Sequence, residues 1–248
     1  MPAERSLLRR LLHRWRRPPG RYDYARIRLT AADIEAKAYR RHLGGGADKW
    51  DRRGRFQVVM LRALGLEPHH RLLDAGCGPL RAGVHLIGTL DAGRYCGIDF
   101  NPDFIATARY LVATDGRLAA KAPRLERLDD FACEQLGDDR FDWVLAFSVL
   151  NHCDEPTRRA FFDRVPTILA PHATVVITHA AWFEESLLRD GPLQLHRMLH
   201  EPNDLEAGID ITAWGFDPPP AGRMFPVAVL KARAGLKARA GRSDANRP

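Results

Sequence analysis

The sequence is poor in cysteine and lacks any cysteine and histidine spacing that is typical of a zinc site. Its 248 residues include four cysteines, at positions 77, 96, 133 and 153, and no two of them form a C-x-x-C pair. Structural zinc sites need such closely spaced ligands. We therefore expect no metal site, and we expect free thiols in a reducing compartment.

The chain also lacks an apolar run of the length that a membrane-spanning helix needs. Near the amino terminus, arginine interrupts every apolar stretch, so no secretory signal is predicted. These two absences make the cytoplasm the expected location of the protein.

The body of the chain has no excess of positive charge, although the formal net charge is +7. Residues 1–28 contain nine arginines against two acidic residues, and residues 231–248 carry a net charge of +5. These ends leave a net charge of −5 for residues 29–230. A large basic groove in the body is therefore disfavoured, and nucleic acid is not supported as a partner of the core.

The two basic ends flank one predicted domain. We place a basic N-terminal extension at 1–28, a single domain at 29–231 and a basic tail, predicted to be disordered, at 232–248. Residues 5–17 carry leucines and a tryptophan at helical spacing, with arginines between them. Such a helix suits peripheral contact with an anionic membrane surface. We favour a terminal helix packed on the body, or a solvated tail, because one short helix is a marginal anchor.

Two helices are predicted before the first strand. Thr30-Ala-Ala-Asp33 has the form of a capping box, which predicts a helix over about 31–43. The glycines at 44–46 separate it from a second helix, which carries Phe56 and Met60 on its apolar face. These helices would form either a lid over a ligand or a plain packing layer on the sheet.

From residue 71 onward, strands and helices alternate. Strands are predicted at 71–74, 95–99, 125–128, 141–147 and 174–178, with helices near 80–90, at 102–114 and from about 156. This alternation predicts an α/β fold in which helices cover both faces of a parallel sheet. Farther along, we expect a helix over 182–199, a short strand near 209–213 and a last strand at 225–230.

Four strand ends define the candidate site, because ligands of open parallel sheets bind outside the carboxyl ends of the strands. Asp99 lies 21 residues beyond Gly78, which suits a carboxylate that accepts hydrogen bonds from the two hydroxyls of a ribose. Phe100 and Phe131 would sandwich a planar base. Each phenylalanine alone is better explained as a core residue, but together the strand ends predict a pocket for a cofactor that contains adenosine.

The glycine loop after the first strand lacks two features of other nucleotide sites. Arg81 stands where the dinucleotide fingerprint Gly-x-Gly-x-x-Gly has its third glycine, and no Walker lysine follows the glycines. The first absence argues against a nicotinamide oxidoreductase. The second argues against a phosphate-cradling P-loop.

Four motifs resemble, in order and spacing, those of class I S-adenosylmethionine-dependent methyltransferases. They are Asp74-x-Gly76-x-Gly78, Tyr95-x-Gly97-Ile98-Asp99, Phe141-Asp142-x-Val144 through Asn151-His152, and Leu169-x-Pro171. The resemblance covers roughly residues 50–180. It implies a three-layer, Rossmann-like fold with a seven-stranded, mostly parallel sheet whose last strand is antiparallel, and it makes 29–231 a methyltransferase domain.

The resemblance also implies S-adenosyl-L-methionine as the cofactor and a role for each strand end. Asp74, Gly76 and Gly78 would hold the methionine end, and Asp99 would hold the ribose. The adenine would contact Phe100, Asp130 and Phe131, and the transferred methyl group would face Phe147 and Ser148. Asp129 is an alternative to Asp130 for the adenine amino group.

The sequence departs from this family at three places. Leu80 occupies a common glycine position, His172-Ala173 stands where two glycines usually follow Pro171, and Pro166 interrupts a family helix. The first change would alter the shape of the loop slightly, whereas the other two lie away from the expected cofactor.

A general base is needed only if the methyl acceptor must lose a proton. His152 and His179 follow the fourth and fifth predicted strands and are the candidate catalytic residues, although His152 is equally well explained as a structural residue. Glu184 and His196 are further candidates. His196 and His200 have i,i+4 spacing on the helix expected there, without a third zinc ligand.

The acceptor itself is not encoded in a recognisable motif. No Asn-Pro-Pro-Tyr-type motif follows the fourth strand, which argues against methylation of the amino groups of nucleic-acid bases, and the isolated Cys153 gives no support for a cysteine nucleophile. A small-molecule or glycan-like acceptor is the preferred hypothesis. RNA or protein recruited by the basic ends, or a module that binds the cofactor without catalysis, are the alternatives.

Overall fold

The computed structural model describes residues 24–43, 47–178, 191–199 and 227–233 of the chain. Several predicted features lie outside these residues. They are the helix over 5–17, the glycines at 44–46, the strand near 209–213, the tail from 234 onward, and His179, Glu184 and His200.

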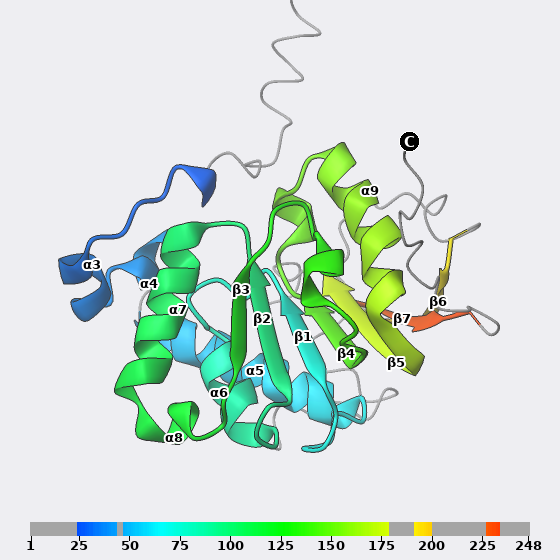
Figure 1. The fold of residues 1–248 in the computed structure, drawn as a ribbon, viewed down its shortest axis with the longest axis horizontal. Coiled ribbons are helices and arrows are strands. Elements are labelled where there is room, and N and C mark those ends of the chain that lie inside the picture. Colours follow the sequence, from blue (N-terminus) through cyan, green and yellow to red (C-terminus); the bar gives the residue numbers. More distant parts are fainter. Residues whose placement is uncertain (1–23, 44–46, 179–190, 200–226, 234–248) are drawn as a thin grey trace, which may run out of the picture.

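Seven strands form one sheet in the order β3-β2-β1-β4-β5-β7-β6 (Figure 1). Neighbouring strands from β3 to β5 are parallel, while β7 is antiparallel to both β5 and β6. The predicted α/β fold, with a seven-stranded and mostly parallel sheet and an antiparallel last strand, is confirmed. The strands are β1 Leu72–Ala75, β2 Tyr95–Asp99, β3 Arg124–Arg127, β4 Phe141–Ala146, β5 Leu169–Thr178, β6 Leu193–Leu199 and β7 Val227–Ala232.

Helices cover both faces of this sheet. Successive residues of a strand point to opposite sides, and apolar side chains therefore form a core on each face. Leu72 and Leu145 pack on one side in a cluster with side chains of α5, α6 and α7. Leu73 and Val144 pack on the other side with α9 and the 3₁₀ turns η1 and η3. Within the described ranges, no helix is both long and apolar enough to cross a bilayer. The helices and turns are α3 Ala31–Glu35, α4 Tyr39–His42, α5 Ala47–Ala63, α6 Gly83–Thr89, α7 Pro102–Thr114, α8 Gly116–Ala119, η1 Cys133–Leu136, η2 Leu150–His152, α9 Glu155–Arg164 and η3 Val165–Ile168.

The helix predicted over 31–43 is broken into two short helices. Its capping box is present, since Asp33 N donates to Thr30 Oγ1 at 3.2 Å and Thr30 N donates to Asp33 Oδ2 at 2.8 Å. Lys37 has a left-handed φ of 55°, which an α-helix cannot contain, and it separates α3 from α4.

The helix predicted over 182–199 is wrong for its last seven residues, which form β6. Leu193 and Leu199 are buried, and the backbone between them pairs with β7, with a register shift between Leu195 and Arg197. Pairing with a neighbouring strand outweighs local helix propensity here. His196 is therefore exposed on a strand, and the helical spacing predicted for it with His200 is wrong.

Two departures from the family pattern leave the sheet intact. Helix α9 ends at Arg164, and Pro166 lies in η3, where a proline is tolerated. His172 is exposed and has a φ of 66°, the left-handed conformation that glycine adopts most easily. It lies within β5, where the pairing with β4 shifts register between Leu169 and Thr174.

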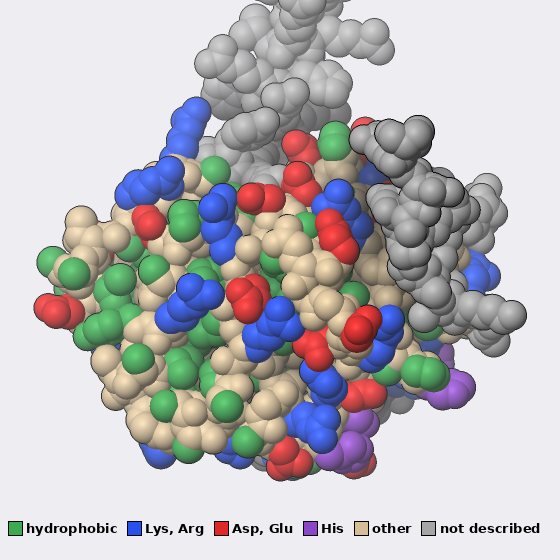
Figure 2. Space-filling view, viewed as in Figure 1, with side chains coloured by type: hydrophobic (Ala, Val, Ile, Leu, Met, Phe, Trp, Pro, Cys, Tyr) green, Lys and Arg blue, Asp and Glu red, His purple; other side chains and the backbone are tan. Residues whose placement is uncertain are grey.

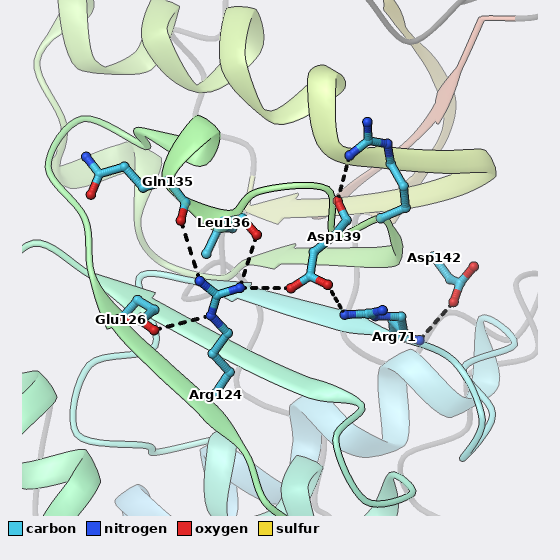
Figure 3. A network of polar contacts seen from close by, with 8 residues as sticks. Arg71, Arg124, Glu126, Gln135, Leu136, Asp139 and Asp142 are labelled. Atoms are coloured by element: carbon cyan, nitrogen blue, oxygen red, sulfur yellow. Dashed lines mark hydrogen bonds and ion pairs between the residues drawn. The ribbon is translucent and has the colours of Figure 1, made fainter. Parts of the chain in front are cut away.

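A network of charged side chains ties the amino ends of the strands together, at the end of the sheet opposite the predicted site (Figure 3). Asp139 pairs with Arg71 and also accepts a hydrogen bond from Arg124 Nη1 at 2.9 Å. Arg71 N donates to Asp142 Oδ2 at 2.8 Å, and Arg124 Nε donates to Glu126 Oε1 at 3.2 Å. These contacts connect the amino-terminal ends of β1, β3 and β4.

Helix α5 lies directly against the segment that follows β1, and Gly54 makes this contact. A Cβ atom at Gly54 would lie 2.1 Å from the backbone oxygen of Arg81 and 3.0 Å from His85 Cδ2. Gly88 on α6 differs, because no atom would lie within 4 Å of its Cβ.

We expect Gly54→Ala to lower the free energy of unfolding by about 1–3 kcal/mol, because a backbone oxygen cannot rotate away from the added methyl group. The matched control, Gly88→Ala, should raise it by up to about 1 kcal/mol through helix propensity. Urea denaturation measures both changes. Equal effects of the two substitutions would contradict the close approach of α5.

Candidate functional site

One pocket lies at the carboxyl ends of β1, β2 and β4 and beside the segment that follows β3. All eight positions predicted to bind the cofactor contribute to its wall, and Ser148 and His152 do so as well. The structure thus brings together residues from four separate strand ends. The eight positions are Asp74, Gly76, Gly78, Asp99, Phe100, Asp130, Phe131 and Phe147.

The backbone bends sharply where it borders this pocket. Gly76 has a φ of 85°, and a Cβ atom on it would lie 2.5 Å from Val149 Cγ2. Leu80, at the family's glycine position, has a φ of 60° and a buried side chain, so it keeps the turn of a glycine. Strained backbone of this kind gathers at functional sites. Left-handed φ angles also occur at Asp130, Phe131 and Ser148.

The carboxylate of Asp99 is buried and held by the backbone on both sides. Gly78 N donates to its Oδ2 at 3.0 Å, and Asn101 N donates to its Oδ1 at 2.9 Å. These two hydrogen bonds fix the carboxylate in the wall of the pocket.

Asp74 is a second buried carboxyl, in the same pocket. Tyr95 Oη donates to its Oδ2 at 2.8 Å. Burial raises the pKa of Asp74 to about 7, and the charge of Asp99 adds to this, while the Tyr95 hydrogen bond and Arg81 oppose it. A cationic group bound beside Asp74 would favour its ionised form.

Asp130 rather than Asp129 lines the pocket. Its Oδ1 accepts a hydrogen bond from Thr157 Oγ1 at 3.3 Å. Asp129 is exposed and pairs with Arg127 at 3.2 Å. The geometry thus favours Asp130 over its neighbour for any contact with a ligand in the pocket.

Two of the phenylalanines in the wall, Phe131 and Phe147, also pack against the core. Phe131 packs edge to face on Phe161, with ring centroids 5.1 Å apart. Phe147 packs edge to face on Phe56, with ring centroids 6.3 Å apart. Phe100 is half-buried in the wall. Packing and ligand contact are therefore compatible roles for these rings.

His152 lies in the pocket wall beside Tyr24, a residue assigned to the N-terminal extension by the sequence alone. The Tyr24 Oη and His152 Nε2 atoms are 3.4 Å apart, and the rings meet edge to face at 4.8 Å. Asn151 Nδ2 lies 3.1 Å from the same His152 nitrogen. Asn101 Nδ2 fixes the segment by donating to Tyr24 O at 2.7 Å. No sequence signal pointed to Tyr24, because its position depends on this distant contact.

Helix α5 serves both as packing layer and as pocket wall. Trp50 and Gln57 line the pocket, whereas Phe56 and Met60 lie in the core. The packing-layer interpretation is confirmed by Phe56 and Met60, and the lid over a ligand stays a prediction. Among the residues that the structure describes, no three potential metal ligands come together.

Comparison with known proteins identifies the fold. Residues 73–175 match the family model of a methyltransferase domain. A TehB-like SAM-dependent methyltransferase from Corynebacterium glutamicum is 22% identical over 82% of this chain and 100% of that chain, with a TM-score of 0.54. Magnesium protoporphyrin IX methyltransferase from Synechocystis, solved with bound SAM, is 17% identical over 82% and 92%, with a TM-score of 0.53. The cyclase SpnF is 15% identical over 73% and 80%, with a TM-score of 0.51.

The raised pKa of Asp74 predicts a pH dependence of stability. Its pKa is about 7 in the folded protein against an ordinary value of 3.8. Between these values the folded state binds more protons than the unfolded state, so the free energy of unfolding falls as the pH rises from about 4 to 7, by up to about 1.4 kcal/mol per pH unit.

Asp74→Asn should remove this contribution, and the exposed Asp129→Asn should retain it. Urea midpoints measured across this pH range compare the variants. A wild-type profile identical to that of Asp74→Asn would show that Asp74 ionises normally.

Proposed function

We propose that the chain carries a class I S-adenosylmethionine-dependent methyltransferase domain and that it moves a methyl group to a small-molecule or glycan-like acceptor. The cofactor of this family is S-adenosyl-L-methionine. The convergence of the eight strand-end residues on one pocket supports the assignment of that pocket to the cofactor.

We assign residues of the pocket to the parts of this cofactor. Asp99 is fixed by two backbone N–H groups and would hold the ribose. Phe100, Asp130 and Phe131 would hold the adenine. Asp74 and the backbone at Gly76 and Gly78 would receive the methionine end, where a bound ammonium group would favour the ionised form of Asp74 against the effect of its burial.

The bound cofactor supplies the methyl group and its own leaving group, so the protein has to align the acceptor in line and exclude water. Phe147 and Ser148 would border the transferred methyl. His152 would accept a proton from an acceptor that must lose one, with Tyr24 beside it. His179 remains a second candidate base.

Enclosure and charge favour a small acceptor over a nucleic acid. Tyr24, Leu43 and Trp50 add largely apolar walls to the pocket, which suits a compact ligand. Residues 29–230 carry a net charge of −5. On the face seen in Figure 2, basic and acidic side chains are interspersed.

Two other functions make different predictions. RNA or protein recruited by the basic ends would require binding that depends on those ends. A non-catalytic module would bind S-adenosylmethionine and transfer no methyl group to any acceptor in a broad screen. The cyclase SpnF shares the fold and is named for another reaction, so the fold alone does not decide between these functions.

Asp99→Ala is expected to weaken binding of S-adenosylmethionine at least 10-fold, because charged hydrogen-bond acceptors for the ribose are lost. Isothermal titration calorimetry measures the affinity, and circular dichroism checks the fold. Asp129→Ala is the control and should bind as tightly as the wild type. Unchanged affinity in Asp99→Ala would contradict the site assignment.

Removal of residues 1–23 and 234–248 separates the small-molecule proposal from the RNA alternative. We expect the shortened chain to keep its affinity for S-adenosylhomocysteine, and the full chain to bind a single-stranded RNA no more tightly than a nonspecific basic protein. Filter binding at several salt concentrations tests this. Tight, salt-dependent RNA binding that disappears in the shortened chain would favour the alternative.

A further inference from the structure

Residues 1–23 join the described part of the chain at the wall of the pocket. Tyr24, the next residue, lines that wall, and its carbonyl oxygen accepts a hydrogen bond from Nδ2 of the buried Asn101 at 2.7 Å. Leu29 N donates to Asp103 Oδ2 at 3.1 Å, so the segment is also held farther along, at the start of α7. The point at which residues 1–23 are attached is therefore fixed beside the pocket.

The sequence of residues 5–17 separates apolar from basic side chains completely. At 100° per residue of an α-helix, the five apolar side chains fall within an arc of about 140°, and all six arginines lie outside it. A face of leucine and tryptophan opposite a face of arginine is typical of helices that lie in a membrane interface. The apolar residues are Leu7, Leu8, Leu11, Leu12 and Trp15.

The groove that α5, α6 and α7 form on the body does not match this segment in charge. It is mostly apolar, with Val58, Val84 and Leu111 in its wall. Like charges would repel an arginine-rich helix there, so this groove is a poor site for residues 5–17. The charged side chains that line it are the basic Lys37, Arg55, Arg117 and Lys121 and the acidic Glu35 and Asp115.

We propose that residues 5–17 bind an anionic lipid surface as an interfacial helix, with the apolar arc in the bilayer and the arginines against the headgroups. This inference goes beyond the proposed function and does not depend on it. One short helix binds weakly and reversibly, and arginines near anionic headgroups add electrostatic attraction. Residues 18–23 alone separate the segment from Tyr24, and an extended chain of that length spans about 20 Å. The bound bilayer would therefore lie close to the pocket.

The apolar arc favours lipid over RNA as the partner of this segment. Arginines attract both partners, because both are anionic. Sequence-independent binding to RNA phosphates, however, depends on the charges and does not require leucines gathered on one face. Interfacial binding to a bilayer requires both faces. The two partners can therefore be distinguished by changing one face at a time.

The test measures flotation of the intact chain with phosphatidylcholine vesicles that contain either about 30% phosphatidylglycerol or none. An apolar-face variant removes large apolar side chains and keeps the charge, and a basic-face variant removes three charges. The apolar-face variant combines Leu8→Gln, Leu11→Gln and Trp15→Gln, and the basic-face variant combines Arg9→Gln, Arg10→Gln and Arg17→Gln.

A matched control removes three charges from the other basic end of the chain. This tail control combines Lys237→Gln, Arg239→Gln and Arg242→Gln. It lowers the net charge as much as the basic-face variant does and leaves residues 5–17 unchanged. Binding of a poly(U) oligonucleotide is measured for the same four proteins.

We expect the wild type to bind the anionic vesicles at least about 10-fold more tightly than the neutral ones. The apolar-face variant should lose at least about 10-fold of this affinity, because insertion requires the apolar side chains. The basic-face variant should lose at least about 5-fold, and the tail control should stay within about 2-fold of the wild type. All four proteins should bind S-adenosylhomocysteine equally in calorimetry, since none of these changes lies in the pocket.

Equal binding to both kinds of vesicle would overturn the proposal, as would an equal loss in the basic-face variant and the tail control. Unchanged vesicle binding by the apolar-face variant would also overturn it, because the arginines would then act by charge alone. Poly(U) binding that exceeds vesicle binding and is lost only in the basic-face variant would assign the segment to RNA instead. A wild type that binds the anionic vesicles but not S-adenosylhomocysteine would contradict the proposed function and leave this inference intact.

Discussion

Backbone hydrogen bonding between β2 and the glycine loop is the interaction on which the site depends. Ile98 O accepts hydrogen bonds from Gly76 N at 2.8 Å and Cys77 N at 3.0 Å, which continue the parallel pairing of β1 and β2 past the end of β1. Asp99, the next residue, then accepts from Gly78 N. One short stretch of β2 therefore sets both the shape of the loop and the position of the carboxylate beside it.

Charge is arranged unevenly around that loop. Asp74 and Asp99 place two carboxyls in a small buried volume, and their mutual repulsion contributes to the raised pKa of Asp74. Arg81 partly offsets it from the far side of the loop. The buried Asp74 carboxyl costs stability as it ionises, and a cationic group bound beside it would favour the ionised form. The affinity for such a group and the pH-dependent stability would therefore be linked through Asp74.

The sheet and most of the pocket wall could be predicted because they depend on local patterns. Apolar runs that end in Asp74 and Asp99 predict both the strands and the strand ends that line the pocket. Tyr24 and β6 could not be predicted, since each is placed by distant partners: Asn101 holds Tyr24, and β7 pairs with β6. Leu80 shows a third limit, because its left-handed φ contradicts the usual preference of leucine.

Titration of the wild-type protein with S-adenosylmethionine, S-adenosylhomocysteine and NAD tests the central claim most directly, namely that the pocket at the ends of β1, β2 and β4 is built for a methyl donor. Calorimetry should show one molecule of either sulfur-containing ligand bound per chain and no binding of NAD. Binding of NAD in preference to the other two, or the absence of binding by all three, would contradict the account.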